Sequence, residues 1–503
     1  MVLGTQPALP MHLDGTVLPE APAWARPGTA ATDEAFLRAS RVSLLHGEPA
    51  GEVYRNGQNS WSPTGWRRLT DPPLRVPGPV RRQTADDTRW DDVVRHHSSW
   101  VMAVSDGTQT VLLGALEGET PRLHADTDVL AAWTERGDDA LWVLLRGPEA
   151  DVFARYRDLL ADRWGVLPTD PGAVWSSWYS YYEEISRAEL DRIVPELPGL
   201  GFGTVQIDDG WQVRVGDWQP NAKFAAGMRD VAGSIVDRGL RPGLWIAPFI
   251  ALPDAEVVQR HPELLLRGPD GQPVHAGSNW GSHYLTFDLT RQDARDHLAE
   301  TVGRAVHDWG FTYLKLDFIN AGAVDGRRSQ DIGREAAYRL AIETVREAVG
   351  PDVYLLGSGA PVIPSLGVLN AVRTGPDVAP MWDNYATDDP SDATARNALT
   401  NAVHRLWLRG LIGLDPDAVY FRHRRSLLND EQMQWLRDSA TISGFRAVSD
   451  PPAWLAPEEQ AELRAYLADE PAIEQVDRYR YRVGSRLVDF GAAVDGAAGH
   501  YPL

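Results

Sequence analysis

The feature that most constrains the fold is a series of eight short apolar runs, separated by helix-length amphipathic segments, that begins near Val174. This alternation is typical of a chain of βα units. Eight such units over roughly 300 residues favour an α/β architecture, the (β/α)8 TIM barrel. The expected strands are Ala173 to Tyr179, Thr204 to Asp208, Arg241 to Ala247, Tyr313 to Phe318, Val353 to Leu356, Ala371 to Thr374, Gly410 to Leu414 and Arg446 to Ser449.

The chain before this series is β-rich. Two apolar runs, 100–105 and 110–113, flank an Asp106-Gly107 step, which is a strong hairpin signal. With further strand candidates at 42–45, 122–124 and 141–145, these runs predict an N-terminal β-sandwich. The expected domains are a sandwich with a linker helix (1–165), a catalytic barrel (166–467) and a short C-terminal β tail (468–503).

Composition excludes several classes of protein. The chain has 49 basic and 70 acidic residues and a formal charge of −21, which disfavours nucleic acid and anionic membranes as partners. It contains no cysteine, so disulfides, thiolate nucleophiles and cysteine-bound metals are excluded. The first 15 residues lack the basic start and apolar core of a secretory signal, so a soluble cytoplasmic protein is expected.

The run Tyr313 to Phe318 places Lys315 and Asp317 two residues apart in an apolar strand. Side chains two apart share one face of a strand, so the two should project together near its C-terminal end. A buried ion pair often costs more in desolvation than it returns, which favours a functional role over a structural salt bridge. A barrel active site lies at this end of the strands.

The other expected strands also end in polar and aromatic residues. Carboxylates accept hydrogen bonds from hydroxyls, and indole faces pack on the apolar side of a sugar ring, so this rim suits a neutral sugar. Each aromatic could instead belong to the core, and each aspartate could be turn or cap chemistry. Core packing and turn or cap chemistry do not explain why all of these residues fall at the same end of successive strands. The rim residues are Trp178, Tyr179, Asp208, Asp209, Trp211, Trp245, Lys315, Asp317, Ser358, Arg373 and Asp377.

Several ordered motifs resemble the α-galactosidases of glycoside hydrolase family 36, which are related to family 27 in the melibiase clan. The resemblance runs through most of the chain. It is carried by NSWSPTGW (59–66), SWYSYY (177–182), QIDDGWQ (206–212), PGLWIAPF (242–249), YLKLDF (313–318) and RTGPDVAP (373–380). It implies an N-terminal β-supersandwich, a (β/α)8 barrel and a C-terminal β-domain, although the tail here is much shorter than that domain.

The resemblance also implies roles for individual residues. Asp317 matches the nucleophile and Asp377 the acid/base, while Asp208 and Asp209 match a pair that binds the O4 and O6 hydroxyls of the sugar. Ser358 stands where many members carry a cysteine near the 2-substituent. Sugar-contacting positions fall on Trp178, Tyr179, Trp245, Lys315 and Arg373, and Trp61 matches a tryptophan that the N-terminal domain lends to the pocket.

Those roles fit a retaining mechanism, which needs one carboxylate to attack and a second carboxyl group to donate a proton. Lys315 should keep Asp317 ionised. Asp377 must start protonated, which requires partial burial or nearby negative charge. Because a guanidinium would oppose this, we expect Arg373 to point at the sugar or at Asp317 and not at Asp377.

The expected protein is therefore an exo-acting, retaining α-galactosidase that uses no metal or cofactor and acts on small α-galactosides. Within enzymes, an α-N-acetylgalactosaminidase or a raffinose-type transglycosylase remains open, as does a homo-oligomer. Two rivals come from other classes: a Schiff-base lyase that uses Lys315, and a carbohydrate-binding protein without activity. The paired aspartates argue against the lyase, and the presence of both catalytic carboxylates gives no support to the binding protein.

Overall fold

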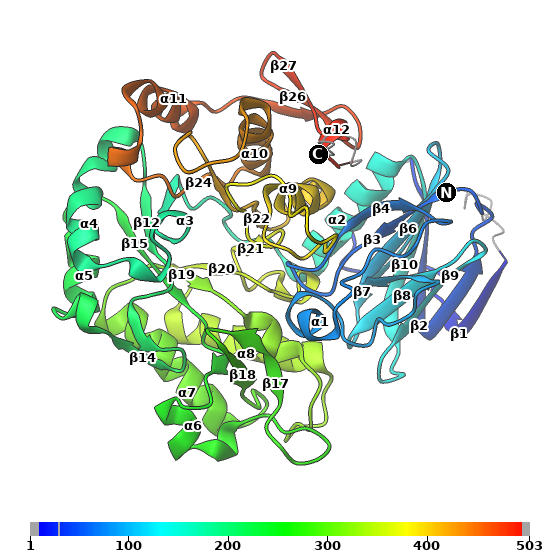
Figure 1. Ribbon diagram of the computed structural model, residues 1–503. Coiled ribbons are helices and arrows are strands. Elements are labelled where there is room, and N and C mark those ends of the chain that lie inside the picture. Colours follow the sequence, from blue (N-terminus) through cyan, green and yellow to red (C-terminus); the bar gives the residue numbers. More distant parts are fainter. Residues whose placement is uncertain (1–9, 29–30, 495–503) are drawn as a thin grey trace.

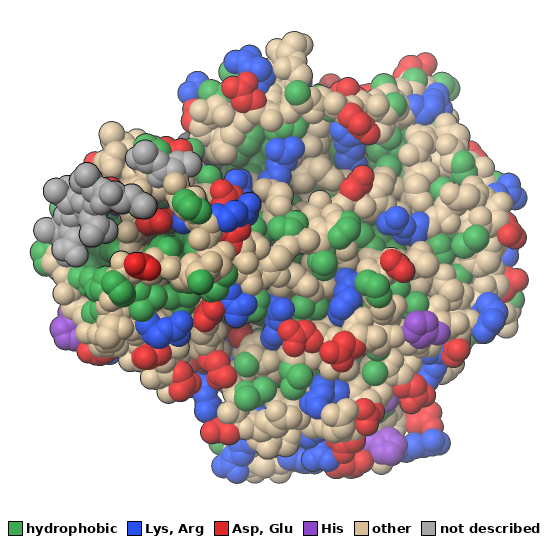
Figure 2. All heavy atoms as spheres, turned by 180° about the vertical axis from the view of Figure 1, so that it is seen from behind, with side chains coloured by type: hydrophobic (Ala, Val, Ile, Leu, Met, Phe, Trp, Pro, Cys, Tyr) green, Lys and Arg blue, Asp and Glu red, His purple; other side chains and the backbone are tan. Residues whose placement is uncertain are grey.

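The computed structural model describes residues 10–28 and 31–494. It contains a β-sandwich, a barrel and a small C-terminal sheet that lies at the top of the view in Figure 1. No helix among the described residues is long and apolar enough to cross a membrane. Acidic and basic side chains are mixed over the face seen in Figure 2.

The sandwich is one antiparallel sheet that folds over on itself. Its strand order is β4-β3-β6-β7-β10-β2-β9-β8-β5, with β1 paired to β2, and β3 meets β5 where the ends of the sheet approach each other. The predicted hairpin is confirmed, because Ser105 pairs with Thr110. The strands are β1 (Met11–Val17), β2 (Asp33–Leu45), β3 (Glu52–Arg55), β4 (Gly65–Arg68), β5 (His96–Ser99), β6 (Val101–Ser105), β7 (Thr110–Glu117), β8 (Pro121–Ala125), β9 (Val129–Thr134) and β10 (Ala140–Gly147).

Two helices join the sandwich to the barrel. Helix α2 (Glu149–Trp164) packs on β7 and β10 and leads into the first barrel strand. Helix α1 (Pro79–Ala85) is short and lies against β17 (His275–Asn279), as Figure 1 shows. There the Thr84 hydroxyl lies 3.0 Å from that of Tyr284. Position 277 must be glycine, since a Cβ there would collide with the Tyr284 hydroxyl.

All eight predicted barrel strands are present and pair in parallel. The sheet order is β22-β21-β20-β19-β15-β12-β11-β24-β23, so the chain segment between β22 and β23 joins the two ends of the curled sheet. The strands are β11 (Val174–Ser176), β12 (Thr204–Ile207), β15 (Arg241–Ile246), β19 (Tyr313–Leu316), β20 (Tyr354–Gly357), β21 (Ala371–Arg373), β22 (Gly413–Asp415), β23 (Ala418–Val419) and β24 (Ala447–Val448).

The barrel helices follow local sequence signals. Helix α8 is rich in strong helix formers and ends at Gly350, whose φ of +85° stops it. Helix α10 begins with a capping box between Asn429 and Gln432. The helices are α3 (Trp178–Tyr181), α4 (Arg187–Ile193), α5 (Met228–Val236), α6 (Glu256–Arg260), α7 (Gln292–Gly303), α8 (Arg334–Val349), α9 (Ala395–His404), α10 (Asp430–Ser443) and α11 (Pro457–Ala468).

The segment between β15 and β19 contains β16 (Ile250–Ala251), β17 (His275–Asn279) and β18 (Ser282–Thr286). These form a separate antiparallel sheet at the barrel rim. A second small hairpin, β13 (Gln212–Arg214) and β14 (Asp217–Pro220), follows β12. The C-terminal sheet consists of β25 (Ile473–Gln475), β26 (Arg480–Val483) and β27 (Arg486–Asp489), followed by α12 (Gly491–Val494).

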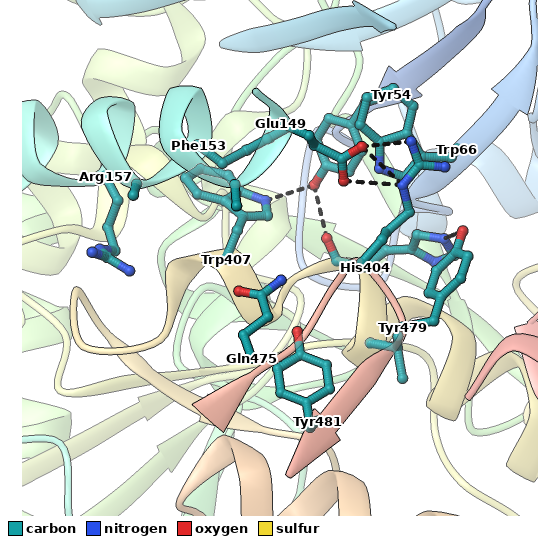
Figure 3. A pocket seen from close by; sticks show the side chains of 14 residues that line it. Tyr54, Trp66, Glu149, Phe153, Arg157, His404, Trp407, Gln475, Tyr479 and Tyr481 are labelled. Atoms are coloured by element: carbon teal, nitrogen blue, oxygen red, sulfur yellow. Dashed lines mark hydrogen bonds and ion pairs between the residues drawn. The ribbon is translucent and has the colours of Figure 1, made fainter. Parts of the chain in front are cut away.

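The C-terminal sheet is fastened at a junction of all three parts of the chain, shown in Figure 3. A cavity of about 70 Å³ is lined there by Tyr54 and Trp66 of the sandwich, by His404 of α9 and by residues of the tail. Arg478 of the tail stacks 4.0 Å above the Trp66 ring and forms ion pairs with Glu52 (2.7 Å) and Glu149 (2.6 Å). Arg478 is 19% exposed, so this contact is partly shielded from solvent.

We expect Arg478→Ala to loosen the tail. Loss of the two ion pairs and of the cation–π contact with Trp66 should lower the free energy of unfolding by about 1–2 kcal/mol. The thermal unfolding midpoint and the rate of chymotrypsin cleavage after Tyr479 measure this. Arg157→Ala is the matched control, because Arg157 lines the same cavity but pairs with the adjacent Asp158. Equal midpoints for the two variants would contradict this role for Arg478.

Candidate active site

A cavity of about 700 Å³ opens at the C-terminal ends of the barrel strands. Most of the residues singled out from the sequence meet there, although they come from distant parts of the chain. Helix α1 of the sandwich and the β17–β18 hairpin form part of its wall. The predicted residues that line it are Trp61, Trp178, Asp208, Asp209, Trp245, Lys315, Asp317 and Asp377.

Lys315 is the central cation of this cavity floor. Its Nζ lies 2.9 Å from Asp208 Oδ2 and 4.0 Å from Asp317 Oδ2, and its side chain is 4% exposed. Burial alone would lower the pKa of Lys315, but the charges of Asp208 and Asp317 outweigh burial and raise the pKa. Lys315 is therefore an ammonium ion at neutral pH and not a nucleophilic amine.

Asp317 is held in place by two donors. Trp245 Nε1 donates to its Oδ2 at 2.8 Å, and the backbone N–H of Phe318 donates to its Oδ1 at 2.9 Å. Phe318 has a left-handed φ of +54°, which lets the chain turn directly after the strand. The arrangement suits an oriented nucleophile.

Asp209 accepts hydrogen bonds from two side chains. Gln212 Nε2 donates to its Oδ1 at 2.5 Å, and Trp280 Nε1 donates to its Oδ2 at 2.8 Å. Burial raises the pKa of Asp209 to about 6, with the neighbouring Asp208 charge adding to the effect while both donors oppose it. Its charge therefore changes close to neutral pH.

Asp377 faces the cavity with 43% of its side chain exposed. Arg373 Nη1 lies 3.1 Å from Asp377 Oδ1. The expectation that Arg373 avoids Asp377 is therefore wrong. Arg373 is buried, and its guanidinium is held between three carboxyl groups, because it also binds Asp415 (3.1 Å) and Asp417 (2.8 Å).

Comparison with known proteins shows the family to which the chain belongs. The melibiase family model matches residues 156–349. An α-galactosidase from Thermus thermophilus, solved with p-nitrophenyl α-D-galactopyranoside, is 40% identical, with a TM-score of 0.86 over 93% of this chain and 96% of that one. The chain belongs to the family 36 α-galactosidases.

Other relatives of this family 36 member are more distant. The α-galactosidase AgaA of Geobacillus stearothermophilus is 28% identical over 216 residues, which are 40% of this chain and 28% of that protein. A blood-group A galactosaminidase of Flavonifractor plautii is 29% identical over 178 residues, 31% of this chain and 16% of its own length. The chain thus aligns with less than a third of either curated relative. The AgaA structure shares the fold, with a TM-score of 0.59 and 16% identity.

Three predicted residues of this family 36 protein stand behind the cavity wall. Ser358 is fully buried and accepts a hydrogen bond from Trp61 Nε1 at 3.1 Å, so it orients the tryptophan lent by the sandwich. The Tyr179 hydroxyl donates to Asp417. Arg373 is enclosed by carboxylates. Among the described residues, the cavity wall thus includes eight of the eleven positions to which the resemblance assigns a role. Trp211, also expected at the rim, is instead fully buried and donates its Nε1–H to the Trp245 carbonyl at 2.9 Å.

Sequence reasoning missed several parts of the wall. Trp280 lies at the tip of the β17–β18 hairpin with a φ of +50°, inside the long segment between β15 and β19. Its signal was the Asn279-Trp280-Gly281 turn, an indole next to turn residues. Phe318, helix α1 and residues Ser391 and Ala393 were also missed. These depend on the packing of the sandwich against the barrel, which no local pattern encodes.

We expect Lys315→Met to destabilise the protein by about 3 kcal/mol, because it leaves the buried Asp208 carboxylate without its cation. Asp208 is 2% exposed at its side chain. The double variant Lys315→Met/Asp208→Asn should recover part of the loss, since it removes the uncompensated charge. Urea unfolding measures both. A Lys315→Met variant as stable as the wild type would show that the Lys315–Asp208 ion pair does not stabilise the fold in this way.

Proposed function

We propose that this protein is a retaining exo-α-galactosidase that removes terminal α-linked galactose from small galactosides. The observation that carries the proposal is that Asp317 and Asp377 face one cavity whose floor holds Asp208, Asp209 and Lys315. Membership of family 36 supports it. The related Thermus protein has been solved with p-nitrophenyl α-D-galactopyranoside and with stachyose.

In the first step, the Asp317 carboxylate attacks the anomeric carbon while the bond to the leaving oxygen breaks. The proton of Asp377 moves to that oxygen, and galactose becomes an ester of Asp317. Trp245 and the Phe318 N–H keep the attacking carboxylate oriented. Lys315 places its ammonium group 4.0 Å from Asp317 Oδ2.

In the second step, ionised Asp377 takes a proton from water, and the resulting oxygen nucleophile attacks the anomeric carbon. The ester bond to Asp317 breaks, so both carboxyl groups return to their starting forms. Two inversions give net retention of configuration. The 43% exposure of the Asp377 side chain supports this role, because it leaves the group accessible to the leaving oxygen and to water.

Sugar recognition rests on the paired aspartates. Asp208 and Asp209 are held by Lys315, Gln212 and Trp280, which leaves carboxylate oxygens fixed at the cavity floor. Fixed carboxylates accept hydrogen bonds from sugar hydroxyls, and Trp178 and Trp280 offer indole surfaces in the wall. An exo mode is supported by the sandwich, whose α1 and Trp61 form part of the cavity wall.

The rival functions receive less support. A Schiff-base lyase needs a neutral amine, whereas the carboxylates around Lys315 raise its pKa. An α-N-acetylgalactosaminidase or a transglycosylase would share these catalytic groups, and no contact of Ser358 favours the former. A cytoplasmic location and a homo-oligomer stay predictions.

We expect Asp317→Gly to abolish hydrolysis of 4-nitrophenyl α-galactoside, with a loss of about 10⁴-fold or more in kcat. Added azide should restore turnover and yield the β-galactosyl azide, because a small anion fills the place of the missing carboxylate. Product configuration by NMR measures this. Wild-type turnover in the variant, or an α-configured azide product, would contradict Asp317 as the nucleophile.

A further inference from the structure

We propose that Asp417 is a positioning residue for the proton donor Asp377, an inference that rests on the proposed function. Asp417 does not line the cavity wall formed by the described residues. It is 3% exposed and lies behind Asp377. No sequence motif pointed to it.

Asp417 occupies the seam of the barrel. Strands β22 and β23 are the two ends of the curled sheet, and only Pro416 and Asp417 lie between them in the chain. Asp417 has a φ of +81°, a left-handed conformation that costs a residue other than glycine about 1–3 kcal/mol. Such strain persists only where surrounding contacts determine it, and it clusters at functional sites.

Four donors hold the Asp417 carboxylate. Its Oδ2 accepts hydrogen bonds from the Tyr179 hydroxyl, from Arg373 Nη1 at 2.8 Å and from the backbone N–H of Val378 at 2.8 Å. Its Oδ1 accepts one from the backbone N–H of Ala418 at 2.7 Å. All four contacts are donated to the carboxylate, so its ionised form satisfies them.

Two of these contacts reach Asp377. Val378 is the next residue in the chain, so its bond to Asp417 fixes the backbone that carries Asp377. Arg373 contacts the Asp377 carboxyl group itself, and Asp417 holds that guanidinium in place. A displacement of 1 Å in a reacting group can cost 100-fold in rate. A rigid support for a half-exposed acid therefore has a catalytic consequence.

The carboxylate of Asp417 also acts through its charge on Arg373. Arg373 serves three carboxylates, those of Asp377, Asp415 and Asp417. Burial raises the pKa of Asp417 to about 7; Arg373 opposes this, while Asp377 and Asp415 add to it. The other titratable groups that face it are Lys315, Tyr179 and Tyr420. Arg373 therefore divides its single positive charge among three carboxyl groups.

Asp415 provides a matched control. It binds the same guanidinium at Nε and is 2% exposed, but its other oxygen accepts from the Asp417 N–H and not from Val378. Asp415→Asn and Asp417→Asn each remove one negative charge from Arg373. Only the second removes the carboxylate that holds the backbone next to Asp377.

The test compares 4-nitrophenyl α-galactoside with methyl α-galactoside, because only the poor methanol leaving group needs strong protonation. In Asp417→Asn, kcat for the methyl glycoside should fall about ten-fold more than kcat for the aryl glycoside. Asp415→Asn should reduce both equally. We call the split the factor by which kcat for the methyl glycoside falls beyond the fall for the aryl glycoside. Asp377→Ala should give the largest split, about 100-fold or more. The two substrates are compared at the pH at which each variant has its maximal kcat, so that a shift of the pH profile does not enter the comparison.

Equal losses on both substrates in Asp417→Asn, or the same split in Asp415→Asn, would overturn the proposal. If Asp417→Asn does not fold, as judged by its thermal midpoint, Tyr179→Phe replaces it, because it removes one donor to Asp417 and keeps the buried ring. Its expected split is about three-fold, and no split would overturn the proposal. A wild type inactive on both substrates would overturn the proposed function itself.

Discussion

The buried contact between Lys315 and Asp208 is the interaction on which the catalytic end of the barrel depends. Lys315 lies on β19, and Asp208 follows β12, with β15 between them. The parallel register pairs Trp245 of β15 with Lys315 of β19, so these two residues lie side by side on neighbouring strands. A shift of one residue would turn Lys315 away from the barrel interior and leave an unpaired charge in the wall.

The sandwich completes the cavity, and its attachment relies on buried charge. Arg334 at the start of α8 binds Asp87 of the sandwich at 2.6 Å, and Arg122 of β8 binds Glu335 of α8 at 2.9 Å. All four side chains are at most 4% exposed. Because a buried charge is costly without its partner, these pairs favour one orientation of the sandwich. That orientation brings Trp61 and α1 to the rim.

The barrel and the floor of its site were predictable from sequence because both follow local patterns. All eight strands form where apolar runs predict them, and polar residues at their ends converge as the parallel topology requires. Trp280 and α1 were not predictable, since their places depend on contacts between segments far apart in the chain. Arg373 shows the same limit, because its contact with Asp377 depends on how the loop after β21 returns. Asp417 joins the site only through barrel closure.

The proposed function requires that the fixed carboxylates of Asp208 and Asp209 at the cavity floor select an α-linked galactose. The most direct measurement is kcat/KM for a panel of 4-nitrophenyl glycosides: α-galactoside, α-glucoside, α-N-acetylgalactosaminide, β-arabinopyranoside and β-galactoside. A preference of at least about ten-fold for the α-galactoside over the α-glucoside is expected, because the equatorial O4 of glucose would not reach the carboxylate acceptors, and a hydrogen bond to a charged group is worth about 1.5–3 kcal/mol. Equal rates for these two epimers, or no turnover of any member, would contradict it.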